Sequence, residues 1–251
     1  MTEATLEASG LTRRFGGLAA CDGVAISLAR GQLHALLGPN GAGKSTLINL
    51  LSGDLKPTSG SIRFRGIEIA GMTADRRARL GIGRSYQKTN IFPAFTVFEN
   101  ARLAAQSRDP RPFAIAVDAT RDPKTRERAH SGLALAGLGE NTERQAGALS
   151  HGEQRQLEIA MVLATEPEVL LLDEPLAGMG AEESARMVAL LKRLAASHAI
   201  LLVEHDMDAV FALADLITVM VNGQVLESGP PEQIRASADV RRAYLGQDEN
   251  G

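Results

Sequence analysis

Apolar positions in the first part of the chain form short runs that are separated by turn residues. Between Leu6 and Leu37 the breaks fall at pairs that contain glycine: Gly16-Gly17, Asp22-Gly23 and Arg30-Gly31. Runs of this length with such boundaries are typical of β-strands, and Ser61 to Ile69 continues the pattern. The pattern therefore predicts a strand-rich beginning, in which Leu33 to Leu37 is an apolar strand.

The middle of the chain has the composition of helices. Alanine, arginine, leucine and glutamate dominate Phe98 to Ala105 and Lys124 to Leu138. Prolines at positions 110, 112 and 123 separate the two segments. Because these residue types favour helices and prolines interrupt them, we expect a helical insertion over residues 97–149.

After the insertion, helical segments alternate with short apolar runs. Predicted helices cover His151 to Ala164 and Ala181 to Ala196, and predicted buried strands cover Val169 to Leu172 and Ile200 to Val203. Alternation of this kind implies parallel β-α-β units, and hence an α/β fold.

A hairpin signal follows. Leu216 to Val221 and Gln224 to Leu226 flank the pair Asn222-Gly223. This pair suits the positive φ angles of a type I′ turn, so we expect two antiparallel strands here.

The composition excludes several classes of protein. With 251 residues, of which 44% are hydrophobic, the chain is long enough for one domain with a sizeable insertion or for two small domains. The net charge of −3 weighs against nucleic acid as the main partner. The single cysteine, Cys21, excludes an internal disulfide and fits a reducing cytosol.

The sequence does not predict direct insertion into a membrane. Met1 to Gly10 contains acidic residues and lacks the apolar centre of a secretory signal. No apolar run approaches the roughly 20 residues that a transmembrane helix needs. Any membrane role is therefore expected to act through a partner.

The strongest chemical signal follows the predicted strand Leu33 to Leu37. It reads Gly38-Pro39-Asn40-Gly41-Ala42-Gly43-Lys44-Ser45-Thr46 and satisfies the P-loop pattern G-x-x-x-x-G-K-[ST]. The glycines let backbone N–H groups surround phosphates, Lys44 reaches the β- and γ-phosphate oxygens, and the Ser45 hydroxyl ligates Mg²⁺. A helix that begins near Lys44 adds the positive end of its dipole. The segment predicts a site for a nucleoside triphosphate, and the alternative is an ordinary glycine-rich turn.

The second signal is the acidic pair that ends the predicted strand Val169 to Leu172. Asp173 and Glu174 should emerge beside the P-loop, because the carboxyl ends of parallel strands line the ligand crevice. Asp173 would hold Mg²⁺, directly or through water, and Glu174 could polarise the water that attacks the γ-phosphate. The alternative is that the two acids simply begin a solvated loop.

The third signal is the segment Leu149-Ser150-His151-Gly152-Glu153. Ser150 and Glu153 form a capping box at the start of a helix, which alone would explain both residues. Between a P-loop and a strand that ends in two acids, however, Leu-Ser-x-Gly-[Gln/Glu] resembles the signature motif of the ATP-binding cassette (ABC) ATPases. The resemblance covers nearly the whole chain.

This resemblance implies an α/β fold: a P-loop NTPase of ABC ATPase type, with a RecA-like mixed-sheet core, an antiparallel β subdomain and a helical insertion. The implied parts are residues 1–96, the β subdomain and the P-loop part of the core; residues 97–149, the helical subdomain; and residues 150–251, the rest of the core with a C-terminal tail. The implied cofactors are ATP and Mg²⁺.

The resemblance also assigns roles to single residues. Ser150, Gly152 and Glu153 would cap the ATP that is held by the P-loop of a second ATPase subunit. Gln87 would contact Mg²⁺ and the attacking water, and would begin the segment that touches membrane subunits. The alternative for Gln87 is a plain solvated loop residue.

Two more assignments come from the same resemblance. His205, in Val203-Glu204-His205-Asp206, matches the switch histidine that contacts the γ-phosphate; the alternative is a structural histidine. Phe15 matches the aromatic residue on which adenine stacks, which would tolerate other bases. The alternative for Phe15 is a core residue.

The chain departs from the commonest family pattern in two places. His151 stands where the signature usually has glycine, and Glu153 stands where it usually has glutamine. An acid near the γ-phosphate would be unfavourable unless its carboxylate turns back to cap the helix. Further on, many members carry a loop that ends in aspartate, whereas this chain reads Leu176-Ala177-Gly178-Met179-Gly180.

The second departure helps to choose a subfamily. Pro175-x-Ala177-Gly178-Met179, with Arg14-Phe15-Gly16-Gly17-Leu18 and Glu204-His205-Asp206-Met207, resembles the ATPase subunits of branched-chain amino acid importers, and most of all the larger of their two ATPases. ATPases of urea or short-amide importers and of lipopolysaccharide export share much of this pattern and remain alternatives.

The partners implied are two transmembrane permease subunits, a second ABC ATPase subunit that is a paralogue or a second copy, and indirectly a periplasmic solute-binding protein, with no nucleic acid. The implied location is cytoplasmic, peripheral on the inner face of the cell membrane. A soluble ABC ATPase that acts on DNA or ribosomes would normally carry a coiled-coil insertion, a zinc module or a second cassette. A nucleotide sensor without hydrolysis would be expected to lack Glu174 or His205, and both are present.

Overall fold

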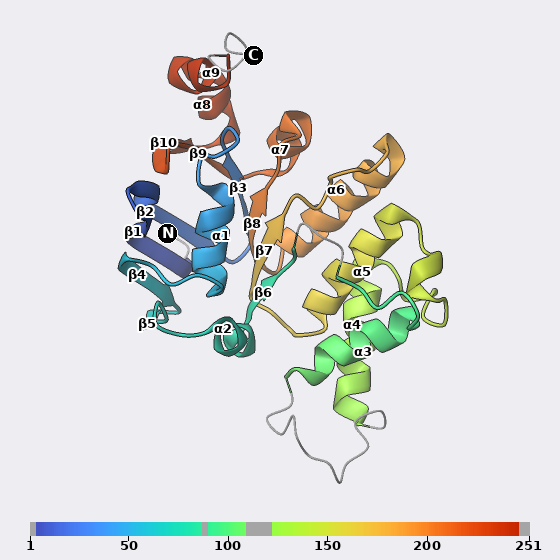
Figure 1. Cartoon of the computed structure of the whole chain (residues 1–251). Helices are drawn as coiled ribbons and strands as arrows, with labels where there is room; N and C mark the ends of the chain where they lie inside the picture. Colours follow the sequence, from blue (N-terminus) through green and yellow to red (C-terminus); the bar gives the residue numbers. More distant parts are fainter. Residues whose placement is uncertain (1–3, 87–89, 109–121, 246–251) are drawn as a thin grey trace.

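The computed structural model describes residues 4–86, 90–108 and 122–245, and their strands form two sheets (Figure 1). One sheet has four strands in the order β2-β1-β4-β5, and the other has six in the order β10-β9-β3-β8-β7-β6. The strands of the four-stranded sheet are β1 (Ala4–Phe15), β2 (Leu18–Ala29), β4 (Ser59–Phe64) and β5 (Ile67–Glu68). Those of the six-stranded sheet are β3 (Gln32–Leu37), β6 (Ile82–Arg84), β7 (Val169–Asp173), β8 (Ala199–Val203), β9 (Leu216–Val221) and β10 (Gln224–Gly229).

Helices connect these strands and cover them. The described helices are α1 (Lys44–Ser52), α2 (Ala74–Leu80), α3 (Val97–Gln106), α4 (Pro123–Ala136), the 3-10 turn η1 (Ala146–Ala148), α5 (His151–Leu163), α6 (Ala181–Ala195), α7 (Met207–Leu213), α8 (Pro231–Ala236) and α9 (Ala238–Leu245). The ranges that the structure describes contain no helix with both the length and the apolar character needed to cross a membrane.

The register of the six-stranded sheet fixes which residues meet at its edge. Strand β3 pairs in parallel with β8 and β9, and β7 pairs in parallel with β6 and β8. Val203 lies opposite Asp173 on one side and Leu36 on the other. The loops that follow β3, β7 and β8 therefore leave the sheet at the same edge, as the predicted parallel units require.

Alternate residues of the central strands face two separate cores. Val169 and Leu171 pack in a cluster with Leu47 of α1 and with residues of the antiparallel sheet, so α1 lies between the two sheets (Figure 1). Leu170 and Leu172 pack on the opposite face, against the helices. Strands that are buried on both faces read as continuous apolar runs, and this explains why the sequence pattern located them.

The described residues of the predicted helical insertion form the helices α3 and α4 and the 3-10 turn η1, and α3 and α4 gather with α5 at one end of the molecule (Figure 1). Ala101, Leu133 and Leu157, one from each helix, belong to the same apolar cluster. Because α5 follows position 149 and still packs with the insertion, the domain boundaries at 96/97 and 149/150 stay a prediction.

The hairpin prediction is confirmed. Strands β9 and β10 are antiparallel, and Asn222 and Gly223 both adopt positive φ, 49° and 80°. Four short helices, α2, α7, α8 and α9, were not expected. Each has at most eight residues, so its periodic pattern is too short to stand out, and helices of this length depend on tertiary packing.

Candidate functional site

The loop between β3 and α1 is shaped by close backbone approaches. Gly38 has φ of 150°, and a Cβ there would come within 2.2 Å of the Met220 carbonyl oxygen. Gly43 has φ of 103°, and a Cβ there would come within 2.2 Å of the Ala20 carbonyl oxygen. Only glycine fits both positions, since the conformation and the space each exclude a side chain. The P-loop spacing therefore reflects packing as well as exposure of N–H groups.

Lys44 begins α1 and folds its side chain back over the loop. Its Nζ donates hydrogen bonds to the carbonyl oxygens of Gly38, at 2.5 Å, and Pro39, at 3.0 Å. Burial lowers the pKa of the Lys44 amine, while the nearby Glu174 and Asp173 carboxylates oppose this shift. The ammonium group thus supports the loop and faces the acids that end β7.

A cleft of about 510 Å³ lies over the loop. Its size is within the range of small-molecule sites. It joins most of the P-loop to residues from three other loops. Its lining residues are Leu18, Ala19, Ala20, Asn40, Gly41, Ala42, Gly43, Lys44, Ser45, Thr46, Glu174, His205 and Asn222. The first turn of α1 opens into this cleft with N–H groups that have no partner within the helix, which suits an anion.

Glu174 and His205 meet just beyond the carboxyl ends of β7 and β8. The Nε2 atom of His205 lies 2.7 Å from Oε1 of Glu174. A carboxylate can only accept, so this ring nitrogen carries the hydrogen. Glu174 has φ of 50°, a conformation that is uncommon for a residue with a side chain. The geometry brings together two residues that the sequence separates by 31 positions.

Asp173 precedes Glu174 and is 3% exposed. Burial raises the pKa of its carboxyl group, and Arg84 is the strongest opposing charge. Within the part of the chain that the structure describes, no group donates a hydrogen bond to its buried Oδ1 atom. A buried carboxylate oxygen without a partner is a suitable ligand for a hard cation.

The described residues include no group of three or more His, Cys, Asp or Glu side chains that could hold a metal by themselves. This fits Mg²⁺, which is usually bound by one or two protein oxygens together with substrate phosphates and water. Ser45 and Asp173 are the described residues that match the predicted donor set. Gln87, the third predicted ligand, lies outside the described residues.

Glu204 is a buried acid that the sequence analysis did not single out. Its Oε1 accepts from the Leu176 N–H at 2.7 Å, and its Oε2 accepts from the His205 N–H at 3.1 Å. Burial raises the pKa of Glu204. The side chain therefore ties the loop after Glu174 to the loop that carries His205.

The predicted capping box at the start of α5 is confirmed. The Ser150 hydroxyl accepts from the Glu153 N–H at 3.2 Å, and Glu153 accepts from the Ser150 N–H at 2.8 Å. The carboxylate of Glu153 also accepts from Arg144 at 2.9 Å. The Glu153 carboxylate is thus turned back onto its own helix. This is the orientation expected for an acid at the position where the signature usually has glutamine.

A second acid lies at the same helix end. Oε1 of Glu183, on α6, accepts from the Ser150 hydroxyl at 2.9 Å and from the Gly152 N–H at 3.3 Å. These contacts lower the pKa of Glu183, chiefly through the hydrogen bond from Ser150. Sequence reasoning missed Glu183 because it lies 33 positions from Ser150 and no motif links them.

Phe15 ends β1 and is 46% exposed, so the alternative of a core residue is wrong. The Arg13 guanidinium lies 4.7 Å from the centre of its ring. Leu18, three residues further on, lines the cleft. Phe15 stays a predicted adenine contact.

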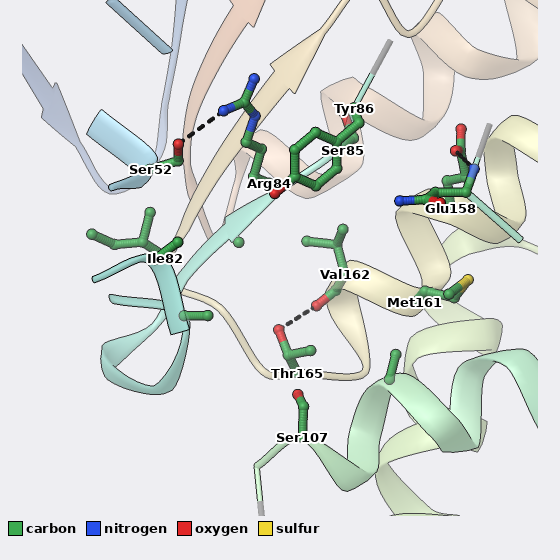
Figure 2. Close-up of a pocket in the computed structure, with 15 residues that line it drawn as sticks. Ser52, Ile82, Arg84, Ser85, Tyr86, Ser107, Glu158, Met161, Val162 and Thr165 are labelled. Atoms are coloured by element: carbon green, nitrogen blue, oxygen red, sulfur yellow. Dashed lines mark hydrogen bonds between the residues drawn. The ribbon is translucent and has the colours of Figure 1, made fainter. Parts of the chain in front are cut away.

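A second cavity, of about 260 Å³, lies beside β6 (Figure 2). Ile82, Met161 and Val162 give it apolar walls, and Arg84 and Tyr86 close one side. Its lining also includes Asn90 and Tyr86, the described residues on either side of the predicted Gln87 segment. The cavity thus lies where the helical insertion meets the sheet.

Comparison with known proteins identifies the family of this chain. The family model described as ABC transporter matches residues 21–177, which is more than half of the chain. The chain belongs to the ABC transporter family. A second model, described as branched-chain amino acid ATP-binding cassette transporter, matches residues 224–250 of this ABC ATPase.

Two curated relatives are similar to this ABC ATPase over nearly its whole length. The high-affinity branched-chain amino acid transport ATP-binding protein BraF of Pseudomonas aeruginosa is 41% identical over 254 residues, 98% of this chain and 100% of that protein. The protein of the same description named LivG, from Escherichia coli K12, is 40% identical over 256 residues, again 98% of this chain and 100% of that protein.

A solved structure supports the fold. The ADP conformation of MJ1267, an ATP-binding cassette of an ABC transporter, superposes with a TM-score of 0.86 at 29% identity, covering 98% of this chain and 100% of that one. The predicted α/β fold of ABC ATPase type is therefore confirmed, with its mixed-sheet core, antiparallel sheet and helical insertion. The chain is an ABC ATPase.

Proposed function

We propose that this ABC ATPase powers the import of branched-chain amino acids. The observation that carries the proposal is the 41% and 40% sequence identity of this chain to BraF and LivG, over the full length of both proteins. The match of residues 224–250 to a model for branched-chain amino acid cassettes adds support from the C-terminal segment. We propose this substrate in preference to the alternatives, urea or amide import and lipopolysaccharide export.

ATP would bind in the 510 Å³ cleft. The P-loop N–H groups and the start of α1 would hold its phosphates, with Lys44 leaving the Gly38 and Pro39 carbonyls to reach them. Leu18 to Ala20 line the cleft on the side of the antiparallel sheet, where Phe15 would receive the adenine. Apart from Ser45, the remaining P-loop residues would act mainly through their backbone.

Hydrolysis would use Glu174 as the group that polarises the attacking water. Its hydrogen bond from His205 holds the carboxylate at the rim of the cleft. His205 is 48% exposed on its side chain and could turn toward a γ-phosphate. Gln87 is proposed to take part from the segment that follows β6.

Mg²⁺ would be held by Ser45, Asp173 and Gln87. Once bound, it would neutralise charge on the β- and γ-phosphates. Ser45 lies in the first turn of α1, and Asp173 ends β7 with one oxygen unpartnered among the described residues. Both side chains therefore sit on rigid elements, which favours a fixed donor geometry.

The catalytic unit would be a pair of ATPase subunits. Ser150, Gly152 and Glu153 at the start of α5 would close over the ATP of a partner, which is a paralogue or a second copy. Closure would satisfy the γ-phosphate from both sides, and hydrolysis would remove that bridge. Gly180 stands where the family often has aspartate, so this subunit would not supply that contact.

The cavity beside β6 supports a docking role for the helical insertion. Tyr86 and Asn90 line it, and Phe92 and Phe95 are exposed nearby in sequence and stack at 5.3 Å. Two permease subunits would contact this region at the inner face of the membrane, with a periplasmic solute-binding protein acting through them and no nucleic acid involved.

The test is uptake in cells that lack the gene for this chain. Uptake of labelled leucine, isoleucine and valine should fall, and the wild-type chain but not Glu174→Gln should restore it. Urea and acetamide uptake serve as controls. Unchanged uptake of all three amino acids, or loss of urea uptake alone, would contradict the proposed substrate. Copurification of two polytopic proteins from native membranes would test the partners.

A further inference from the structure

Arg84 is the last residue of β6 and connects three parts of the molecule. Its Nη1 donates to Asp54 at 2.6 Å and to Ser52 at 2.9 Å, both at the far end of α1 (Figure 2 shows the contact with Ser52). Its Nη2 lies 3.8 Å from Oδ2 of Asp173. Its guanidinium carbon lies 4.7 Å from the centre of the Tyr86 ring.

The contact with Asp173 is screened from water. The side chains of Arg84 and Asp173 are 9% and 3% exposed. Ion pairs in such surroundings interact much more strongly than exposed pairs, because little solvent screens them. Arg84 therefore acts on a carboxylate that the sheet has already removed from solvent.

The two oxygens of Asp173 have different surroundings. Oδ2 faces Arg84, whereas Oδ1 receives no hydrogen bond from any residue in the described ranges. The guanidinium of Arg84 is itself fixed, since Asp54 holds its other nitrogen. This arrangement holds the carboxylate in one orientation and leaves one oxygen available.

We propose that Arg84 is a positioning residue that orients the Asp173 carboxylate for Mg²⁺. In this role Arg84 would act through Asp173 and not through direct contact with the metal, as the partners of metal ligands often do. The inference rests on the Mg²⁺ site proposed above. Since Arg84 also forms a wall of the 260 Å³ cavity, it links that cavity to the nucleotide site.

The test measures how Mg²⁺ changes ATP binding, without turnover. Affinity for ATP is measured by calorimetry with EDTA and then at increasing Mg²⁺. Arg84→Met, which keeps length but removes charge, should keep its metal-free affinity within about 2-fold and need about 10-fold more Mg²⁺ than wild type. Asp54→Asn is the matched control, because it removes a charge beside Arg84 while its amide oxygen can still accept the hydrogen bond that holds Arg84, and it should stay within about 3-fold of wild type.

A double-mutant cycle separates positioning from a structural role. In the Asp173→Asn background, Arg84→Met should cause no further change in the Mg²⁺ requirement. An equal loss in both backgrounds, or an unchanged requirement in the single variant, would overturn the inference. If Arg84→Met does not fold, Arg84→Lys should give an intermediate increase, and a wild-type requirement there would also overturn it. Absence of any Mg²⁺ effect in wild type would instead contradict the proposed Mg²⁺ site, and the inference with it.

Discussion

The Ser150 hydroxyl donates a 2.9 Å hydrogen bond to Glu183, so a carboxylate of this chain lies at the end of α5 that is proposed to meet the ATP of a partner. Oε1 of Glu183, which accepts this bond, also accepts from the Gly152 N–H. A Cβ at Gly152 would come within 2.6 Å of the Glu183 carboxyl carbon. A carboxylate and a γ-phosphate would compete for these donors, and their charges repel. If the pair closes as proposed, Glu183 would have to move first.

Glu183→Ala should make closure easier. We expect the ATP concentration that drives subunit pairing to fall by about 10-fold, equivalent to one hydrogen bond to a charged group. The measurement is sedimentation of the pair in the Glu174→Gln background, where turnover is slow. Glu182→Ala is the matched control, because Glu182 contacts Arg186 on the exposed face of the same helix turn. Weaker pairing of Glu183→Ala, with its melting temperature unchanged, would show that Glu183 supports the signature instead.

Glu174→Gln should bind ATP but lose turnover by about 100-fold or more, since an amide cannot accept the proton of the attacking water. It can still accept the hydrogen bond from His205, so the local geometry should persist. Phosphate release and ATP affinity are measured on the same preparation. Turnover near the wild-type rate would rule out Glu174 as the base.

Lys44→Ala should weaken ATP binding by about 10-fold or more, because it removes the charge that reaches the phosphates. It also removes two hydrogen bonds that support the loop, to Gly38 and Pro39. A melting-temperature comparison without nucleotide therefore accompanies the affinity measurement. Unchanged affinity for ATP would count against the P-loop assignment.

The burial of His34 predicts that the stability of the fold falls at acid pH, independently of the nucleotide site. It is buried, its Nδ1 donates to the Ser27 carbonyl oxygen at 3.1 Å, and its Nε2 accepts from Thr218 at 2.7 Å. Burial lowers its pKa, and the hydrogen bond to Ser27 partly opposes the shift. Since the folded pKa lies below the unfolded value, its contribution to stability is present above the unfolded pKa and is lost as pH falls.

The free energy of unfolding in urea should therefore fall between pH 7 and pH 5.5 by about 1 kcal/mol more in wild type than in His34→Gln. Glutamine can keep hydrogen bonds to Ser27 and Thr218 but does not titrate. Because all other acids and bases are shared by the two proteins, the difference isolates His34. Parallel pH profiles would contradict the assigned shift.

The elements that carry the site could be predicted because their signals are local. The P-loop glycines are required by the local backbone conformation. The Ser150–Glu153 capping box lies within one helical turn, and the strand before Asp173 is apolar on both faces. Each of these patterns is complete within a short stretch of sequence. The short helices α2 and α7 carry no such pattern and went unpredicted.

The missed residues are charged side chains whose partners are distant in sequence. Arg84 lies 32 positions from Ser52, and Glu183 lies 33 from Ser150. Glu204 was missed for a different reason. Its neighbour His205 was recognised as a site residue, but the sequence did not indicate that Glu204 is buried and accepts from the Leu176 N–H. In each case the amino acid alone is equally compatible with a solvated surface position.

The sequence by itself determined that this protein has a glycine-rich loop between a strand and a helix, an acidic strand end, a capped helix that begins at His151 and their order along the chain, because local backbone requirements and apolar periodicity specify them. Only the tertiary structure decided which side chains meet. Strand order brings Arg84 beside Asp173 and His205 beside Glu174, and helix packing brings Glu183 to Ser150. Such contacts depend on how elements are arranged in space, which periodicity within one element does not encode.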